Sequence, residues 1–126
     1  MKIDVSFLAK ILTSEELLKP DDAATLNGLR DKNVEFVPFS ADGSDYAINH
    51  FLDDSDELGY GYECTNKLIG NDKYMIFAIA EGDDALCIER SSGHIFLWLI
   101  QSANGKIIQL STTIAKFLDI SVAVVD

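Results

Sequence analysis

Two short runs of acidic residues are the part of the sequence best suited to a function. The residues in these runs are Asp53, Asp54, Asp56 and Glu57, then Glu81, Asp83 and Asp84. Carboxylates gathered in this way can bind a cation or attract a basic protein surface. Loops that only keep the protein soluble are the alternative interpretation of each run. We take all seven residues as candidates for binding a partner.

The first acidic run lacks the spacing of a calcium-binding EF-hand loop. With Asp54 at loop position one, Asp56 and Gly59 fall at the required positions three and six. Position five is Leu58, and position twelve is Thr65, where the loop needs a glutamate that binds through both oxygens. The run therefore predicts no dedicated metal site, and an adventitious cation is the alternative.

Residue types used in nucleophilic catalysis are present but scattered. His50 and His94 are the only side chains that ordinarily titrate near neutral pH, and neither lies beside Cys64 or Cys87 in the sequence. Two isolated cysteines supply neither a disulfide framework nor a zinc-site spacing, and the apolar run around Cys87 favours a buried thiol. We therefore predict a protein that is not an enzyme and that holds no cofactor or metal.

The net charge of the chain is strongly negative. Its 126 residues include 21 aspartates and glutamates against 10 lysines and arginines, a formal charge of -11. Binding to nucleic acid or to an anionic membrane needs a basic surface, so both are excluded as expected partners. A basic protein would be attracted over a distance.

Length and hydropathy predict one soluble domain over residues 1–126. The length is typical of a single domain, and the hydrophobic fraction of 48% is sufficient for a core. The longest apolar runs have six or seven residues, against about 20 for a membrane span. Lys2, Asp4 and Lys10 interrupt the N-terminal segment, unlike a secretory signal. We expect a cytoplasmic protein.

Two helices are predicted in the first third of the chain. Asp4 is a candidate N-cap for the first, because the apolar residues at 8, 11 and 12 share one helical face. Thr13 and Glu16 have the spacing of a capping box that would begin another short turn. Pro20 suits the first position of the second helix, which should end near Asp31 or at the Asn-Gly pair before it.

Residues 34–52 give weaker strand signals. Val34 to Phe39 predicts a strand that Pro38 ends or confines to a sheet edge. The apolar island of Ile48, Phe51 and Leu52 fits either a short helix or a strand.

An antiparallel β-meander is predicted from residue 74 onward. Strands over 74–80, 85–90, 94–100 and 106–110 are joined by links too short for parallel crossovers, and the last link contains Asn104-Gly105, a hairpin dipeptide. The first of these strands is apolar on both faces, so it should be an interior strand, and Trp98 should pack in the core. Ser111 is expected to cap a helix with an apolar stripe at 114, 117 and 118, and residues 120–125 suit a last strand.

Residues in the last 55 positions follow a recognisable order. They are Gly82, Asp83, Leu86, Ile88, Gly93, Ile95, Trp98, Phe117 and Leu118. This order of a Gly-Asp link, an aliphatic strand, a turn glycine, an aromatic strand and a helix ending in Phe-Leu resembles the SUKH superfamily, the Smi/Knr-type domain. The first half departs from that family, with Leu18-Lys19-Pro20-Asp21-Asp22 where members carry Leu-Pro, an acidic residue and tyrosine.

The resemblance implies an α+β fold, with a central antiparallel sheet flanked by N-terminal helices and one C-terminal helix. It also implies an immunity protein that binds a toxin, here a basic one such as a nuclease domain. Other family members are interaction domains, and the family supplies no catalytic residues. The alternatives are an oligomerisation module, or a ligand-binding or enzymatic domain with a pocket lined by Tyr60, Tyr62 and Phe77 and by His50 or a carboxylate.

Overall fold

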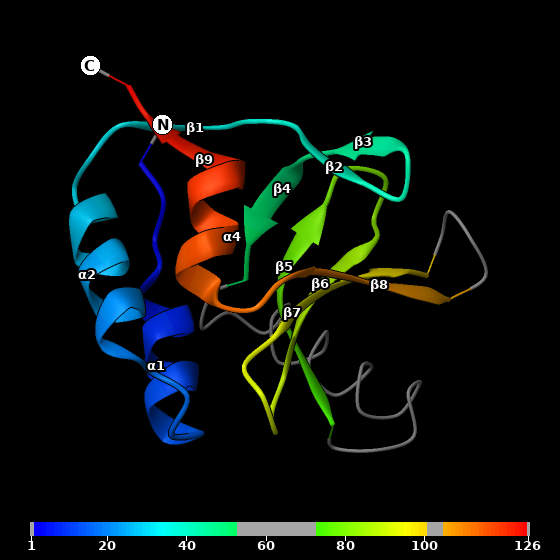
Figure 1. The fold of residues 1–126 in the computed structure, drawn as a ribbon. Helices are drawn as coiled ribbons and strands as arrows, with labels where there is room; N and C mark the ends of the chain where they lie inside the picture. Colours follow the sequence, from blue (N-terminus) through cyan, green and yellow to red (C-terminus); the bar gives the residue numbers. More distant parts are fainter. Residues whose placement is uncertain (1, 53–72, 101–104, 126) are drawn as a thin grey trace.

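The computed structural model describes residues 2–52, 73–100 and 105–125, which form two layers (Figure 1). The helices α1 (Ser6–Ser14), α2 (Pro20–Leu29) and α4 (Ile114–Ser121) lie together beside one antiparallel sheet of five strands. In sheet order these strands are β4 (Ile48–Phe51), β5 (Tyr74–Ala80), β6 (Ala85–Glu89), β7 (Ile95–Leu99) and β8 (Lys106–Ser111). The predicted α+β class and the antiparallel meander are confirmed.

Two smaller antiparallel pairs complete the described part of the fold. The strand β1 (Val34–Phe36) pairs with β9 (Val122–Val124), and β2 (Phe39–Ala41) pairs with β3 (Ser44–Tyr46). The single strand predicted from Val34 to Phe39 is thus divided in two at Pro38, which has no amide hydrogen to donate to a ladder. The ambiguous apolar island at 48–52 forms the strand β4.

Two predicted helix caps are wrong. Thr13 lies inside α1 and its hydroxyl donates to the Ala9 carbonyl at 2.8 Å, so it does not cap the turn that follows, in which the Glu16 amide donates to the Thr13 carbonyl at 3.1 Å. Glu16 follows the helix with a φ of 58°. Thr113, not Ser111, is the N-cap of α4, because Ser111 still belongs to β8 and its hydroxyl donates to the Thr113 carbonyl at 2.7 Å.

The interior strand β5 carries apolar side chains on both faces, as predicted. Met75 and Phe77 join the cluster that includes the helices, whereas Tyr74 and Ile76 join a second cluster. The pairing with β6 skips Phe77, so Phe77 and Ala78 both belong to the helix-side cluster. An extra residue of this kind is a β-bulge, which bends the strand locally.

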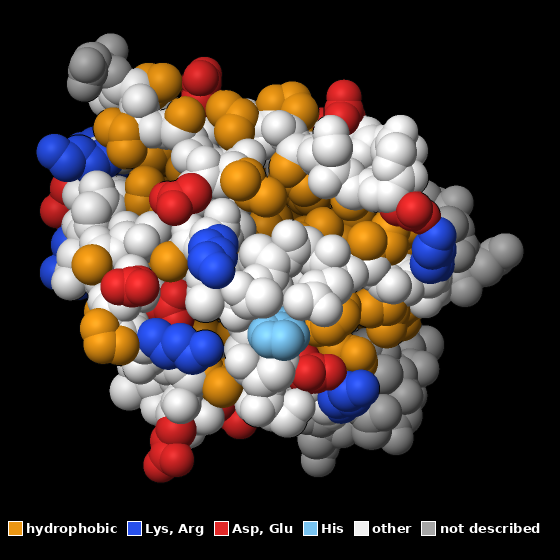
Figure 2. Space-filling model, in the orientation of Figure 1, with side chains coloured by type: hydrophobic (Ala, Val, Ile, Leu, Met, Phe, Trp, Pro, Cys, Tyr) orange, Lys and Arg blue, Asp and Glu red, His pale blue; other side chains and the backbone are white. Residues whose placement is uncertain are grey.

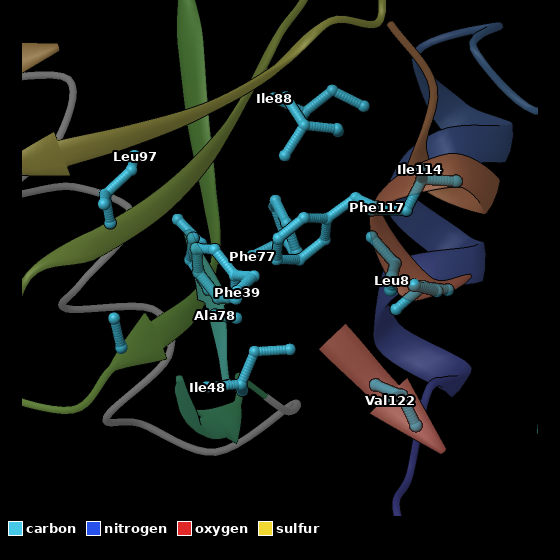
Figure 3. Close-up of a cluster of buried hydrophobic side chains, with 14 of the residues drawn as sticks. Leu8, Phe39, Ile48, Phe77, Ala78, Ile88, Leu97, Ile114, Phe117 and Val122 are labelled. Carbon is cyan, nitrogen blue, oxygen red and sulfur yellow. The ribbon is translucent and has the colours of Figure 1, made fainter. Parts of the chain in front are cut away.

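A chain of aromatic rings forms the centre of the core between sheet and helices. Phe117 of α4 meets Phe39 edge-on with ring centroids 5.3 Å apart, and Phe77 with centroids 6.0 Å apart. Figure 3 shows these three rings grouped between the sheet and the helices. Phe51 continues the chain from Phe77 to Phe36, at 6.3 and 5.9 Å. The rings therefore tie α4 to β1, β2, β4 and β5.

Candidate functional site

The structure describes three of the seven acidic residues expected to bind a partner. The run from Asp53 to Glu57 lies outside the described residues. Glu81 and Asp83 are exposed in the link between β5 and β6. Asp84 is completely buried, and we correct its assignment to the binding surface. The physical reason is that strand pairing already begins there, with the Ala80 amide donating to the Asp84 carbonyl at 2.8 Å.

A tight turn and one long-range bond hold Glu81 in place. The Asp83 amide donates to the Ala80 carbonyl at 3.1 Å, which closes the turn, and Gly82 between them has a φ of 87° that favours glycine. The Glu81 amide donates to the carbonyl of Ala47 at 2.8 Å. This bond places the Glu81 backbone directly beside the start of β4.

Glu81 lies at an open hollow of about 190 Å3, which we call the acidic hollow. Its lining residues are Pro38, Asp45, Tyr46, Ala47 and Glu81. Two acidic residues that are 36 positions apart in the sequence therefore line one depression. Asp45 was not among the sequence candidates, because it belongs to neither acidic run.

Asp45 is brought to the acidic hollow by the β2–β3 hairpin, which the sequence analysis missed. The signal for it is the dipeptide Asp42-Gly43, with φ angles of 51° and 81°, as a two-residue type I′ turn requires. Across the hairpin, the Ser40 hydroxyl donates to Asp45 Oδ1 at 2.8 Å. This bond orients the Asp45 carboxylate but does not neutralise its charge.

The acidic residues of the hollow differ in ion pairing from other acidic residues in the described part of the chain. Lys106 pairs with Asp42, which raises the pKa of that lysine, and Lys73 lies 3.4 Å from Glu89. Neither Asp45 nor Glu81 has a lysine or arginine partner within the described residues. Within the described part of the chain, the acidic hollow therefore presents two acidic side chains that no lysine or arginine neutralises.

A second hollow of about 210 Å3, which we call the aromatic hollow, contains His50. Its lining residues are Lys2, Ile3, Asp4, Phe36, Asn49, His50 and Phe51. His50 Nδ1 lies 2.6 Å from Asn49 Oδ1, an oxygen that can only accept, so Nδ1 carries the proton of this bond. The other candidate histidine, His94, has its Nδ1 3.4 Å from Gln109 Nε2 on β8.

Phe77, which was expected to line a pocket between sheet and helices, belongs to the packed core of the described residues. This side chain is only 1% exposed and packs in the aromatic chain, so it lines neither hollow. Tyr60 and Tyr62 lie outside the described residues. A further hollow of about 270 Å3 lies between the N-terminal segment and α1 and α2, with Asn27, Arg30 and Asp31 on its wall.

Cys87 and Trp98 belong to the second apolar cluster, against which Phe7 of α1 also packs. Burial raises the pKa of the Cys87 thiol to about 12, so the reactive thiolate is scarce at neutral pH. Trp98 is 6% exposed, in agreement with its predicted core position. Over residues 2–52, 73–100 and 105–125, no group of histidine, cysteine and acidic side chains is placed to hold a metal ion.

Each helix in the described part of the chain is too short or too polar to cross a bilayer. Comparisons with protein-family models, curated proteins and solved structures found no match to this chain.

Proposed function

We propose that this chain is a cytoplasmic protein-binding domain that recognises a basic partner, and that the partner is a toxin domain. The observation that carries the proposal is the acidic hollow, which Asp45 and Glu81 both line and where neither has a cationic partner among the described residues. The resemblance of the second half to SUKH immunity proteins supplies the toxin as the kind of partner.

The size and lining of the acidic hollow favour one inserted side chain over a free small molecule. Its volume of about 190 Å3 is below the range of about 300–1,000 Å3 typical of small-molecule pockets. The head of a lysine or arginine can form charge-assisted hydrogen bonds to the carboxylates of Asp45 and Glu81. Tyr46 and Pro38 offer apolar surface to the methylene stem of the same side chain.

The charge of the whole molecule supports the same class of partner. With a formal charge of -11, the chain attracts a basic protein before contact and speeds their encounter. Figure 2 shows acidic side chains spread over the visible face, with hydrophobic side chains gathered in its upper part. The spread of charge supplies the long-range attraction, and the acidic hollow supplies a fixed point of contact.

A ligand-binding or enzymatic role is the second candidate, and the position of His50 in the aromatic hollow is the observation in its favour. We prefer protein binding because Phe77, which was expected in the wall of a ligand pocket, is buried in the core. Titration of His50 monitored by NMR in the presence of the neighbouring gene product would separate the two roles. A partner that leaves the His50 signals unchanged is compatible with protein binding at the acidic hollow alone.

The test is binding to the product of the neighbouring gene, the position in which a cognate toxin is encoded. We expect a complex that protects cells from that product. Replacing Asp45→Asn together with Glu81→Gln should raise Kd by roughly tenfold or more, because hydrogen bonds to charged groups contribute about 1.5–3 kcal/mol each. The matched control is Glu35→Gln with Asp119→Asn, which changes the net charge equally at exposed positions away from the hollow.

Two results would contradict this proposal. One is the absence of binding and of protection with the neighbouring product. The other is an equal loss of affinity in the hollow variant and in the control variant, because the acidic hollow would then have no specific part in binding.

A further inference from the structure

Two segments of the chain each contribute residues to both the acidic hollow and the aromatic hollow. Residues 45–51 form one segment, in which Ala47 lines the acidic hollow and Phe51 lines the aromatic hollow. The other is a short segment in which Pro38 lines the acidic hollow and Phe36 the aromatic hollow. The two hollows are therefore neighbours along these two segments, which border a strip that we call the seam.

The strand that borders the seam is extended and lies at the end of the main sheet. Within the described residues, β4 pairs with β5 on one side and has no second partner in the five-stranded order. Its pairing register shifts at Asn49, which is exposed. Extended segments of partner proteins commonly bind alongside end strands of this kind.

The two ends of the seam differ in chemistry. The acidic hollow offers the carboxylates of Asp45 and Glu81. The aromatic hollow offers the rings of Phe36 and Phe51, tilted by 50° with centroids 5.9 Å apart, and is also lined by Ile3. A cation fits the first end, and an aromatic ring fits the second, where it can pack against those two rings.

The two ends are four positions apart along the chain, which fits an extended partner. Ala47, directly before β4, lines the acidic hollow, and Phe51, the last residue of β4, lines the aromatic hollow. At a strand rise of about 3.3 Å per residue, four positions span roughly 13 Å. In an extended partner, side chains four positions apart lie on the same face at the same separation.

We propose that the seam binds an extended segment of the basic partner that carries an arginine or lysine and an aromatic residue four positions apart. The inference rests on the proposed function for the cation at the acidic hollow, and it adds the aromatic anchor and the spacing between them. The cationic head lies between Asp45 and Glu81. The aromatic ring packs in the aromatic hollow against the ring surfaces of Phe36 and Phe51 that line it.

The test uses synthetic peptides of about nine residues and the full-length, nitrogen-15-labelled chain. Two probes carry arginine and phenylalanine separated by three glycine or serine residues, one in each order, because the direction of the segment is open. The matched controls have two residues between the same side chains, which places them on opposite faces of an extended segment. We expect the better four-position peptide to bind at least roughly fivefold tighter than either control, a ratio of about 1 kcal/mol.

Each end of the seam can be tested by substitutions in the peptide, without altering the protein. Replacing phenylalanine by alanine, or arginine by glutamate, should each abolish the preference for four-position spacing. The largest amide shifts should fall at Ala47 and Phe51, which line different hollows. Phe36→Leu, a smaller change at a half-buried side chain, should weaken the phenylalanine peptide and leave its alanine version unchanged.

The seam inference is overturned if neither order outperforms its control, or if removing the phenylalanine has no effect. It is also overturned if the shifts concentrate outside the seam. These outcomes leave the proposed function standing as long as the neighbouring gene product binds and the double substitution at Asp45 and Glu81 weakens it. Loss of binding to that product, by contrast, removes the proposed function itself.

Discussion

At the scale of single residues, Asp22 is a buried carboxylate that joins the beginnings of two helices. Its Oδ1 accepts a hydrogen bond from the Ala115 amide at 3.0 Å, and its Oδ2 accepts one from the Lys19 amide at 3.3 Å. Amides at a helix start lack acceptors within the helix, and the dipole there favours an anion. The bond to Ala115 spans 93 positions and therefore fixes α2 against α4.

Replacement of Asp22 should destabilise the fold much more than replacement of its neighbour. Asp22→Ala leaves the buried Ala115 amide without this acceptor, so we expect the free energy of unfolding to fall by about 2–3 kcal/mol. Asp22→Asn keeps one oxygen acceptor and should cost less. Asp21→Ala, at the exposed neighbouring position, is the control and should cost under about 0.5 kcal/mol. Urea unfolding would measure all three, and equal losses at both positions would contradict the bridging role.

Glu89 should contribute stability that depends on pH. A hydrogen bond from the Ser92 hydroxyl, 2.6 Å long, and the nearby Lys73 lower the pKa of this carboxyl below its ordinary value of about 4.5. Its contribution is therefore present above that ordinary value and is lost as pH falls through the lowered pKa of the folded state.

The corresponding measurement compares the native chain with Glu89→Gln. The difference between their free energies of unfolding should be largest near neutral pH and should shrink as pH falls below about 4. Ser92→Ala, which removes the main cause of the shift, should reduce the same difference. A gap that is constant across this pH range would show that Glu89 has the same pKa folded and unfolded.

Sequence patterns correctly predicted the features that depend mostly on neighbours in the sequence. Pro20 begins α2 and the stripe of Ile114, Phe117 and Leu118 is buried, as the spacing indicated. The bond from Asp22 to Ala115 was not predictable, because its acceptor and donor are distant in sequence. Asp84 was misplaced for a similar reason, since its burial depends on where the turn ends and strand pairing resumes.

At the scale of elements, strand length decided what the sequence could predict. The meander strands β5 to β8 have five to seven residues, enough for an apolar pattern to be recognised. The strands β2 and β3 have three residues each, and β3 is mostly polar, so only the Asp42-Gly43 dipeptide marked their hairpin. For α4, the apolar stripe was predicted correctly, but the N-cap is Thr113, two positions after the predicted Ser111.

The aromatic chain makes Phe117 the side chain that couples α4 to the strands. Phe117→Ala should lower the free energy of unfolding by about 3–5 kcal/mol, because it removes a fully buried ring and leaves a cavity beside Phe39 and Phe77. Ile120→Ala on the same helix, at a side chain that is 47% exposed, should cost under about 1 kcal/mol. Chemical denaturation would compare them. Similar losses would mean that the docking of α4 does not depend on the ring contacts.

At the scale of the whole molecule, the fold class was predictable and the candidate surface was not. The meander and the helices follow from patterns that each occupy one stretch of chain. The acidic hollow needs three segments, around Pro38, Asp45 and Glu81, which come together only after the β2–β3 hairpin and the β5–β6 turn have formed. Of the acidic residues that line the hollow, the acidic runs in the sequence therefore identified Glu81 but missed Asp45, which belongs to neither run.

The charge of the molecule and the acidic hollow should affect binding in different ways. Reversing Asp53, Asp54, Asp56 and Glu57 to lysine changes the net charge from -11 to about -3, so association with a basic partner should slow by roughly tenfold at low salt. Added salt screens that attraction and should remove most of the difference.

The double substitution at Asp45 and Glu81 should instead speed dissociation, because contact groups act mainly on the lifetime of the complex. Stopped-flow association and surface-based dissociation measurements with the neighbouring gene product would separate these effects. If the reversed run also shortens the lifetime of the complex at high salt, those four residues are part of the contact surface. An unchanged association rate at low salt would mean that the long-range field of the molecule does not steer the encounter.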